Sequence, residues 1–460
     1  MLRLILIMAL YCMSYPAWAE DDLMSLYQKA EQHYADYRAA LVNTEADREE
    51  LNKAKALFYP KVQMALSRGR GITDRTTQTA IGSLETSLDY RLENYAFSVR
   101  QPLFNKETWA IYDGAKSFVS AQESLLRQEN AKLMLKLTAT YLEVLYARAK
   151  VDLLHAKVSA VVQQLRQAEK RYAQGSGTVV EINEAQTNLD IANAEIIQAD
   201  NDLNEHLNTL YIMTGEDSLL SAELTVAQLP QALPKEESLD YWLAKAKQEH
   251  PEIVAATYNL EVAKQELEKK RAGHYPTLDL VGVRSYSEND SNNTLGSRFD
   301  TTTVALQMSV PLFAGGYVSA SVRQAASKLV AAEESLTGKT REVESQVRKY
   351  YSHVISQFQT IRAYQQAVKS SGVAFDGTQK GFIAGFKTNI EVLDAQQKLF
   401  NNQLELTKAH YSLINDWVNL KFSSGLLNQS ELIKISAMFT TQSHTTPPSR
   451  SQHETQARLH

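Results

Sequence analysis

The stretch GFKTNIEVLDAQ, Gly385 to Gln396, has a near copy in the same chain, GSGTVVEINEAQ, from Gly175 to Gln186. Gly, Thr, Glu, Ala and Gln stand at matching places, and a second carboxylate is matched in kind, Glu184 against Asp394. The leading glycine can supply a left-handed turn, and the threonine three residues later can cap a following helix. The stretch therefore predicts the tip of a helical hairpin, present twice in one chain.

Other landmarks recur in the same order and at nearly constant distance. The offsets are 216, 209, 210 and 210 residues for these pairs: Tyr59-Pro60 with Tyr275-Pro276, Pro102-Leu103-Phe104 with Pro311-Leu312-Phe313, Gly175 with Gly385, and Thr214-Gly215 with Ser424-Gly425. Chance matches would not keep both order and spacing. The pattern therefore indicates a tandem duplication of about 200 residues.

The bulk composition excludes several classes of protein. The 460 residues are 44% hydrophobic and 22% charged with only 10 prolines, which favours long ordered segments over disorder. The net charge of −5 offers no basic surface of the kind that nucleic acid requires. No nucleic-acid partner is expected.

The first nineteen residues, 1–19, are typical of a secretory signal peptide. Arg3 precedes an apolar run from Leu4 to Met13, and Ala17-Trp18-Ala19 fits an A-x-A cleavage site. The one cysteine, Cys12, follows a bulky residue, which disfavours lipid attachment there. Cleavage after Ala19 would leave an exported chain without disulfides. No later stretch has the roughly 18 uninterrupted apolar residues that mark a transmembrane helix.

Each half begins with a helix and ends in a long helical hairpin. The stretch 22–57 lacks Gly and Pro and predicts one helix, which 252–270 repeats, and Tyr-Pro ends both. Residues 103–173 and 312–384 predict very long helices, the second with kinks at Gly372 and Gly377. Returning helices are expected over 178–214 and 388–423.

Between these helices the apolar period changes from 3.6 to 2. Apolar and polar residues alternate over 62–67, 95–100 and 304–312, which predicts strands with one apolar face in two pairs, 60–101 and 277–312. The polar linkers ITDRTTQTAIGS, from Ile72, and SENDSNNTLGS, from Ser287, are predicted to be exposed hairpin loops. Strands that meet lipid must close into a barrel, which needs eight or more of them. Four strands per chain therefore predict an oligomer.

The signal peptide, the doubled helix-strand-strand-helix plan, the YP and PLF landmarks and the doubled tip together resemble the TolC family of outer-membrane efflux and secretion ducts, over about Asp21 to Ile435. The resemblance implies an α+β membrane protein, a trimer whose outer-membrane β-barrel takes four strands from each protomer and continues into a long periplasmic α-helical tunnel. The implied layout is a first repeat over 20–215, a connecting segment over 216–250, a second repeat over 251–425, an equatorial C-terminal segment over 426–440 and a disordered tail over 441–460.

The resemblance also implies a gate. In the family, carboxylates just past the second-repeat tip face the pore, and the matching positions are Glu391 and Asp394, three apart on one helical face. Lys387 matches a basic residue that pairs with a neighbouring protomer. Phe382 stands where some members have a tyrosine whose hydroxyl joins that contact, and a phenylalanine cannot donate the bond.

Glu181 and Glu184 are the first-repeat counterparts of these carboxylates. Three copies of the chain would crowd six second-repeat carboxylates around one axis and raise their pKa values. An alternative remains open, because Lys387 and Glu391 are four apart, as are Asp394 and Lys398, and such spacing also gives ordinary surface ion pairs.

Three further sets of residues are assigned from their positions. The hairpin tips, where a periplasmic adaptor would dock, are marked by Gly175, Thr178, Gly385 and Thr388. The turns from barrel to helix are marked by Pro102, Phe104, Pro311 and Phe313. Four aromatic residues flank the strands, and two alternatives are open for them, aromatic belts at the membrane interfaces or buried packing: Tyr59, Tyr95, Tyr275 and Phe299.

The function expected from the resemblance is a passive exit duct that works with a periplasmic adaptor and an inner-membrane ABC or proton-driven pump, in type I protein secretion, multidrug efflux or both. The alternative is a periplasmic coiled-coil scaffold or adaptor protein. The ten histidines show no H-E-x-x-H spacing and no G-x-S-x-G elbow is present, so neither a cofactor, a metal nor enzymatic activity is expected.

Overall fold

The computed structural model describes residues 22–217, 222–224, 229–230, 232, 237–291 and 294–441. The predicted signal peptide and nearly all of the predicted tail lie outside these residues. The chain divides into two compact units. We call them the helical unit (1–40, 128–250 and 342–460) and the strand unit (41–127 and 251–341) and describe each by itself.

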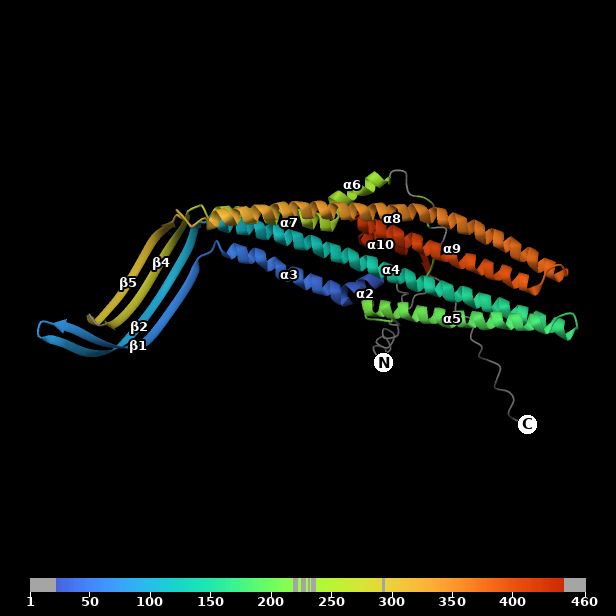
Figure 1. The fold of residues 1–460 in the computed structure, drawn as a ribbon, viewed down its shortest axis with the longest axis horizontal. Helices are drawn as coiled ribbons and strands as arrows, with labels where there is room; N and C mark the ends of the chain where they lie inside the picture. The colour runs from blue at the N-terminus through green and yellow to red at the C-terminus, as the bar shows by residue number, and fades with distance from the viewer. Residues whose placement is uncertain are drawn as a thin grey trace, which may run out of the picture. The chain divides into compact units, whose positions relative to one another are not determined.

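The strand unit holds one antiparallel sheet of four strands (Figure 1). Its strands are β1 (Lys61–Thr79), β2 (Gly82–Phe104), β4 (Thr277–Ser291) and β5 (Thr294–Ser309), in the order β1-β2-β4-β5. The second strand of the first repeat thus pairs with the first strand of the second repeat. Among the described residues, β1 and β5 each have one strand neighbour, so the sheet has two open edges.

The two predicted loops are for the most part strand. β1 and β2 pair without a register shift from Lys61 opposite Arg100 to Thr79 opposite Gly82, which leaves a turn of two residues. In the second repeat, β4 continues to Ser291. The prediction was wrong because these threonine-rich and charged segments have no apolar face to bury, yet they still satisfy their backbone groups by pairing across the hairpin.

One face of the sheet carries exposed apolar side chains, and we call it the apolar face. The side chains on it that are apolar and exposed are Val62, Met64, Leu66, Phe97, Leu280, Val304, Leu306 and Met308. Tyr95 stacks on Tyr286 of the neighbouring strand at the border of this face, with ring centroids 5.9 Å apart. Phe299 lies on the opposite face, beside Ser287, so the alternation of the strand contradicts its placement in an aromatic belt with Tyr95.

The chain forms two long helical hairpins, whose tips and returning helices belong to the helical unit (Figure 1). The first joins α4 (Lys106–Ala173) to α5 (Val179–Thr214), and the second joins α8 (Tyr317–Ile383) to α9 (Asn389–Ser423). Helix α8 runs for 67 residues without interruption, through Gly372 and Gly377. The returning helices lie within one residue of the positions that the sequence predicts.

The first hairpin is closed by a seam with a seven-residue period. Ala185, Ala192 and Ala199 of α5 are fully buried. The buried residues of α4 show the same period: Ala147, Leu154, Val161 and Ala168. Ala199 forms one buried apolar cluster with Val151 and Leu154 of α4, and the seven-residue period on both helices is typical of a coiled coil. Lys157 donates to Glu195 across the seam at 2.6 Å, which satisfies a lysine that is almost completely buried.

The single helix predicted over 22–57 is two helices. Helix α2 (Leu23–His33) ends at Tyr34, whose ψ of 113° is extended, and α3 (Ala35–Ala56) begins directly after it. Lys136 of α4 donates to the Tyr34 hydroxyl at 2.6 Å and lies over its ring, so tertiary contacts hold the break in a sequence without Gly or Pro. The break frees α2 to pack on α5 and on α10 (Gln429–Ser436).

The segments that follow each repeat meet in the helical unit. Strand β3 (Ala222–Leu224) pairs with β6 (Phe439–Thr441), and α6 (Leu239–Glu249) buries Trp242 completely. The Trp242 ring lies edge-on to Trp417 of α9, with centroids 5.9 Å apart, and Lys421 lies over it. Of the helices in the described part of the chain, none combines the length and apolar character needed to cross a membrane.

Candidate functional site

The two hairpin tips have the same backbone geometry. Gly175 and Gly385 have φ of 73° and 83°, and each N–H donates to the carbonyl three residues before it, at 2.9 and 3.0 Å. The next two amides both donate to the carbonyl of Arg171 in the first tip and of Gly381 in the second. These bonds satisfy the last carbonyls of α4 and α8, and only glycine adopts the left-handed turn without strain.

Both returning helices begin at the predicted threonine. The Thr178 hydroxyl accepts from the N–H of Glu181 at 3.2 Å, and the Thr388 hydroxyl accepts from the N–H of Glu391 at 3.3 Å. Only the second cap is reciprocal, because the Glu391 carboxylate also accepts from the N–H of Thr388 at 2.8 Å. The second tip is therefore the more firmly fixed of the two.

Glu391 is held by its own tip. Lys387 donates to its carboxylate at 2.6 Å, and this bond is the main reason that the pKa of Glu391 is lowered to about 2. The Thr388 amide adds to the effect. Within one chain the direction is thus opposite to the rise expected from crowded carboxylates. The Lys387–Glu391 pair matches the alternative of an ordinary surface ion pair. It also holds the Glu391 carboxylate in place at the start of α9.

The other predicted carboxylates have different surroundings. Asp394 is exposed, and in the described part of the chain its carboxylate forms no ion pair with Lys398. Glu181 is half-buried, and one of its carboxylate oxygens is buried without a hydrogen-bond partner among the described residues. Glu184 is half-buried one turn further along α5. Each hairpin thus brings its own two carboxylates to the first turns of its returning helix.

Phe382 makes a contact that the sequence did not suggest. The guanidinium of Arg171, at the end of α4, lies 4.5 Å from the centroid of the Phe382 ring, at the end of α8. A cation over an aromatic face is attracted to it, by about 0.5–1 kcal/mol at an exposed site. This contact joins the two hairpins of one chain at their tips.

The duplicated turn explains where the two cations stand. Position 171 carries arginine and position 177 glycine, whereas the equivalent positions 381 and 387 carry glycine and lysine. A Cβ on Gly381 would lie 2.8 Å from Lys387 Cγ, and one on Gly177 would lie 3.0 Å from Arg171 Cβ. The turn therefore accommodates a side chain at only one of these two positions. The first tip has its cation, Arg171, at the end of α4, and the second has its cation, Lys387, just before α9. Comparison of the repeats at these two positions was the signal that could have revealed Arg171.

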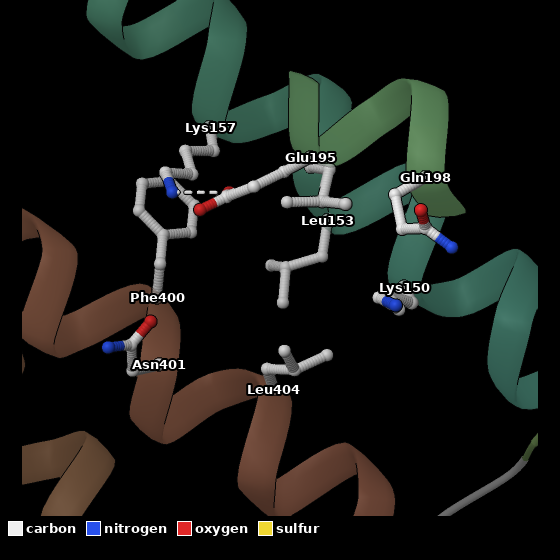
Figure 2. Close-up of a pocket in the computed structure, with 9 residues that line it drawn as sticks. Lys150, Leu153, Lys157, Glu195, Gln198, Phe400, Asn401 and Leu404 are labelled. Atoms are coloured by element: carbon white, nitrogen blue, oxygen red, sulfur yellow. Dashed lines mark hydrogen bonds and ion pairs between the residues drawn. The ribbon is translucent and has the colours of Figure 1, made fainter. Parts of the chain in front are cut away.

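Further contacts join the hairpins along α4 and α9. Gln164 donates to the buried Gln396, and Tyr146 lies edge-on to Tyr411 at 6.0 Å. Between these contacts lies a cavity of about 200 Å³ (Figure 2). Leu153 of α4 and Leu404 of α9 point toward one another across it. The contact between α4 and α9 is thus apolar at Tyr146, polar at Gln164 and incompletely filled between these two residues.

The predicted turns between sheet and helix lie in the strand unit. Pro102 and Phe104 flank a bulge at the end of β2, and Pro311 and Phe313 lie between β5 and α8. Phe313 is 90% exposed, so it packs against little within one chain. Phe58 is the aromatic residue that packs here, edge-on to Trp109 with centroids 4.9 Å apart.

The left-handed glycines give a prediction for stability. Replacing Gly385 by alanine places a Cβ at φ of 83° and is expected to lower the free energy of unfolding by about 1–2 kcal/mol. Gly372→Ala, within α8 and facing open space, should raise it by roughly 0.5–1 kcal/mol. Thermal unfolding of the two variants in detergent measures both. Equal effects of one sign would contradict the assigned geometry.

Among the described residues, no group of His, Cys, Asp or Glu side chains is arranged to hold a metal ion. The tips present charges, capped helix starts and exposed apolar side chains, including Phe386 at 86% exposure. Such surfaces are suited to contact with other proteins or with ions in a pore.

The comparison with known families decides the assignment. A model described as "Outer membrane efflux protein" matches residues 26–216 and 242–426, which cover both repeats. The chain belongs to the outer membrane efflux protein family. It is accordingly an outer-membrane channel protein that extends into the periplasm, and family membership favours this reading over a periplasmic scaffold or adaptor.

Relatives of this outer membrane efflux protein include secretion proteins and TolC itself. It is 29% identical to the alkaline protease secretion protein AprF of Pseudomonas aeruginosa, over 91% of this chain and 87% of that protein. It is 28% identical to the proteases secretion protein PrtF of Dickeya chrysanthemi, over 91% of each chain. It is 25% identical to TolC of Escherichia coli, over 93% of this chain and 87% of TolC.

Solved structures share the fold. CusC superposes with a TM-score of 0.76 at 18% identity, covering 89% of this chain and 93% of that one. VceC of Vibrio cholerae superposes with a TM-score of 0.71 at 19% identity, covering 88% and 96%. At this level of identity the two superpositions show that the fold is shared.

Proposed function

We propose that three copies of this chain assemble into one channel through which export substrates leave the periplasm passively. The observation that carries the proposal is the four-stranded sheet with an exposed apolar face and two open edges, β1 and β5. Unpaired edges are not tolerated in hydrocarbon, so the sheet must close with other copies. Three sheets of four strands give a barrel of twelve, within the size range of bacterial outer-membrane barrels.

The duplicated hairpins then supply the periplasmic end of the channel. Three chains bring six tips together, and Glu391 and Asp394 of each second tip form an acidic ring around the pore. In the assembled channel we infer a further contact between neighbouring chains, from Lys387 of one chain, which also holds its own Glu391, to Glu181 of the next. Exposed side chains at the tips, such as Phe386 and Val180, form the docking surface for a periplasmic adaptor.

The cargo we propose is protein, delivered by an inner-membrane ABC transporter and its adaptor. Two relatives at 29% and 28% identity over nine-tenths of this chain are named for protease secretion. Efflux of small molecules by a proton-driven pump is the second candidate, since relatives named for efflux are also found, such as BepC of Brucella suis at 23% identity.

A deletion strain separates the two kinds of cargo. Loss of the chain should abolish the appearance of one or more proteins in the culture medium. Complementation should restore it. Measurement of secreted protein together with susceptibility to dyes and detergents gives both readouts. Unchanged secretion with raised susceptibility would overturn the protein cargo in favour of efflux.

The lowered pKa of Glu391 gives a prediction for pH dependence. Because its carboxylate is stabilised in the folded protein, its charge and the tip contacts it makes persist below its ordinary pKa near 4.5 and are lost only as pH falls through about 2. In an Asp394→Asn background, cation preference should therefore stay constant from pH 7 to about 3.5. Adding Lys387→Met should move the loss to higher pH, toward the ordinary value near 4.5 but still below it because the Thr388 amide bond remains, and reversal potentials in planar bilayers measure this shift.

Two outcomes would contradict this reading of the tip. Loss of cation preference near pH 4.5 without the lysine change would mean that Lys387 does not hold Glu391 in the assembled channel. An unchanged profile in the double variant would mean that another group stabilises the carboxylate. Lys398→Met is the matched control, because it removes a lysine from the same helix without touching Glu391.

A further inference from the structure

The sheet carries a cluster of arginines beyond the end of its apolar band. Arg68, Arg70 and Arg91 lie on the apolar face of β1 and β2, because they continue the alternation of Met64 and Leu66. We call these three residues the arginine cluster. The side chains of Arg68 and Arg70 are each 71% exposed.

The cluster places like charges directly opposite one another. Arg70 and Arg91 face each other across the β1–β2 ladder. Such a pair is destabilising unless an anion lies between the two charges. Asp89 pairs with Arg70, and Glu93 pairs with Arg68 at 2.9 Å. The three guanidinium groups of the cluster therefore share two carboxylates, whereas Arg298 and Glu288 of the same face form an ion pair of their own.

The other face of the same rows carries no charge. The residues there are Ser67, Gly69, Leu92 and Asn94. Charges that served only to solvate the strands would be expected on both faces. Their restriction to the apolar face indicates that this face meets a charged layer at this height, whereas the opposite face does not.

The height of the cluster matches a lipid headgroup layer. From Met308 to the row of Tyr286 and Asp300, this face covers eight residues of β5, or about 26 Å of strand, close to the roughly 25 Å band of outer-membrane barrels. The ion pair between Arg284 and Asp300 lies within this stretch. The stacked Tyr95–Tyr286 pair closes this band, as aromatic side chains do at a membrane interface. Arg68 lies one row beyond it, opposite Glu93, on the side away from the start of β1 at Lys61.

We propose that the arginine cluster binds phosphate groups of the lipid in the outward leaflet, the phosphorylated glycolipid lipopolysaccharide. Guanidinium groups bind phosphate oxygens through two parallel N–H donors, and arginine rather than lysine fills every basic position of the cluster. A phosphate between Arg70 and Arg91 would neutralise the pair that Asp89 satisfies only in part. The inference rests on the proposed barrel, in which the apolar face meets lipid.

Binding of purified lipid A to the detergent-solubilised protein tests the proposal. Arg70→Gln/Arg91→Gln should weaken binding of diphosphorylated lipid A by about 10- to 30-fold. Lys61→Gln/Arg75→Gln is the matched control, since it removes two cations from the opposite face of β1 and should change binding less than twofold. Arg70→Lys/Arg91→Lys keeps the charge without the paired donors and should fall between the two.

The outcomes separate this site from the channel itself. Equal binding of dephosphorylated lipid A, or equal losses in the matched control, would overturn the phosphate site. Competition by millimolar inorganic phosphate with no preference for lipid A would show that a free anion, not the lipid, is recognised, which also overturns it. Conductance in planar bilayers should be the same for all variants, and its absence from the wild-type protein would overturn the barrel instead.

Discussion

Neutralising the second-repeat carboxylates should open the channel. We expect Glu391→Gln/Asp394→Asn to raise single-channel conductance several-fold and to abolish block by divalent cations. Removing Glu391 breaks both the 2.6 Å bond to Lys387 and the reciprocal cap of α9. The double variant also removes both of the charges that each chain contributes to the proposed acidic ring, where cations would be held.

The matched control removes the same charge from the same hairpin. Asp376 of α8 and Glu405 of α9 are both exposed and lie away from the tip. Asp376→Asn/Glu405→Gln should leave conductance and cation block unchanged. If the control raises conductance as much as the tip variant, the effect reflects overall charge and the assignment of Glu391 and Asp394 to the pore is wrong.

Replacing Trp242 should have the largest effect on stability. Trp242 is fully buried between Trp417 and Lys421, and it attaches α6 to α9. Trp242→Ala is expected to lower the free energy of unfolding by about 3–5 kcal/mol, from lost burial and the cavity left behind. Denaturant unfolding measures this loss, and limited proteolysis near α6 should show its release.

Two further variants show whether the loss of stability comes from the buried ring of Trp242. Tyr241, next in sequence but 39% exposed, should cost less than about 1.5 kcal/mol when changed to alanine. Trp242→Phe should recover much of the loss, because the apolar ring contact with Trp417 is kept. A Trp242→Ala loss no greater than that of Tyr241→Ala would show that α6 is not held through this ring.

Much of the fold could be predicted from the sequence because the chain contains two similar repeats. Each repeat tests the other, so the tips, the returning helices and the strand pairs were found from landmarks at constant spacing. The turn glycines and capping threonines are local signals whose effect does not depend on the rest of the chain.

The remaining features depend on contacts between distant residues. The break at Tyr34 is held by Lys136 of another helix, which no local propensity reveals. The long hairpins beyond Ile72 and Ser287 pair polar strands, for which apolar periodicity gives no signal. The Arg171–Phe382 contact joins residues 211 positions apart, and no local pattern in the sequence links the two.

The central claim is that three chains close one barrel, and the mass of the purified protein in mild detergent tests it most directly. Native mass spectrometry after removal of the detergent should give three times the mass of the mature chain, with no stable monomer or dimer. A monomer, or any number of chains other than three, would contradict the twelve-stranded barrel and with it the acidic ring proposed at the tips.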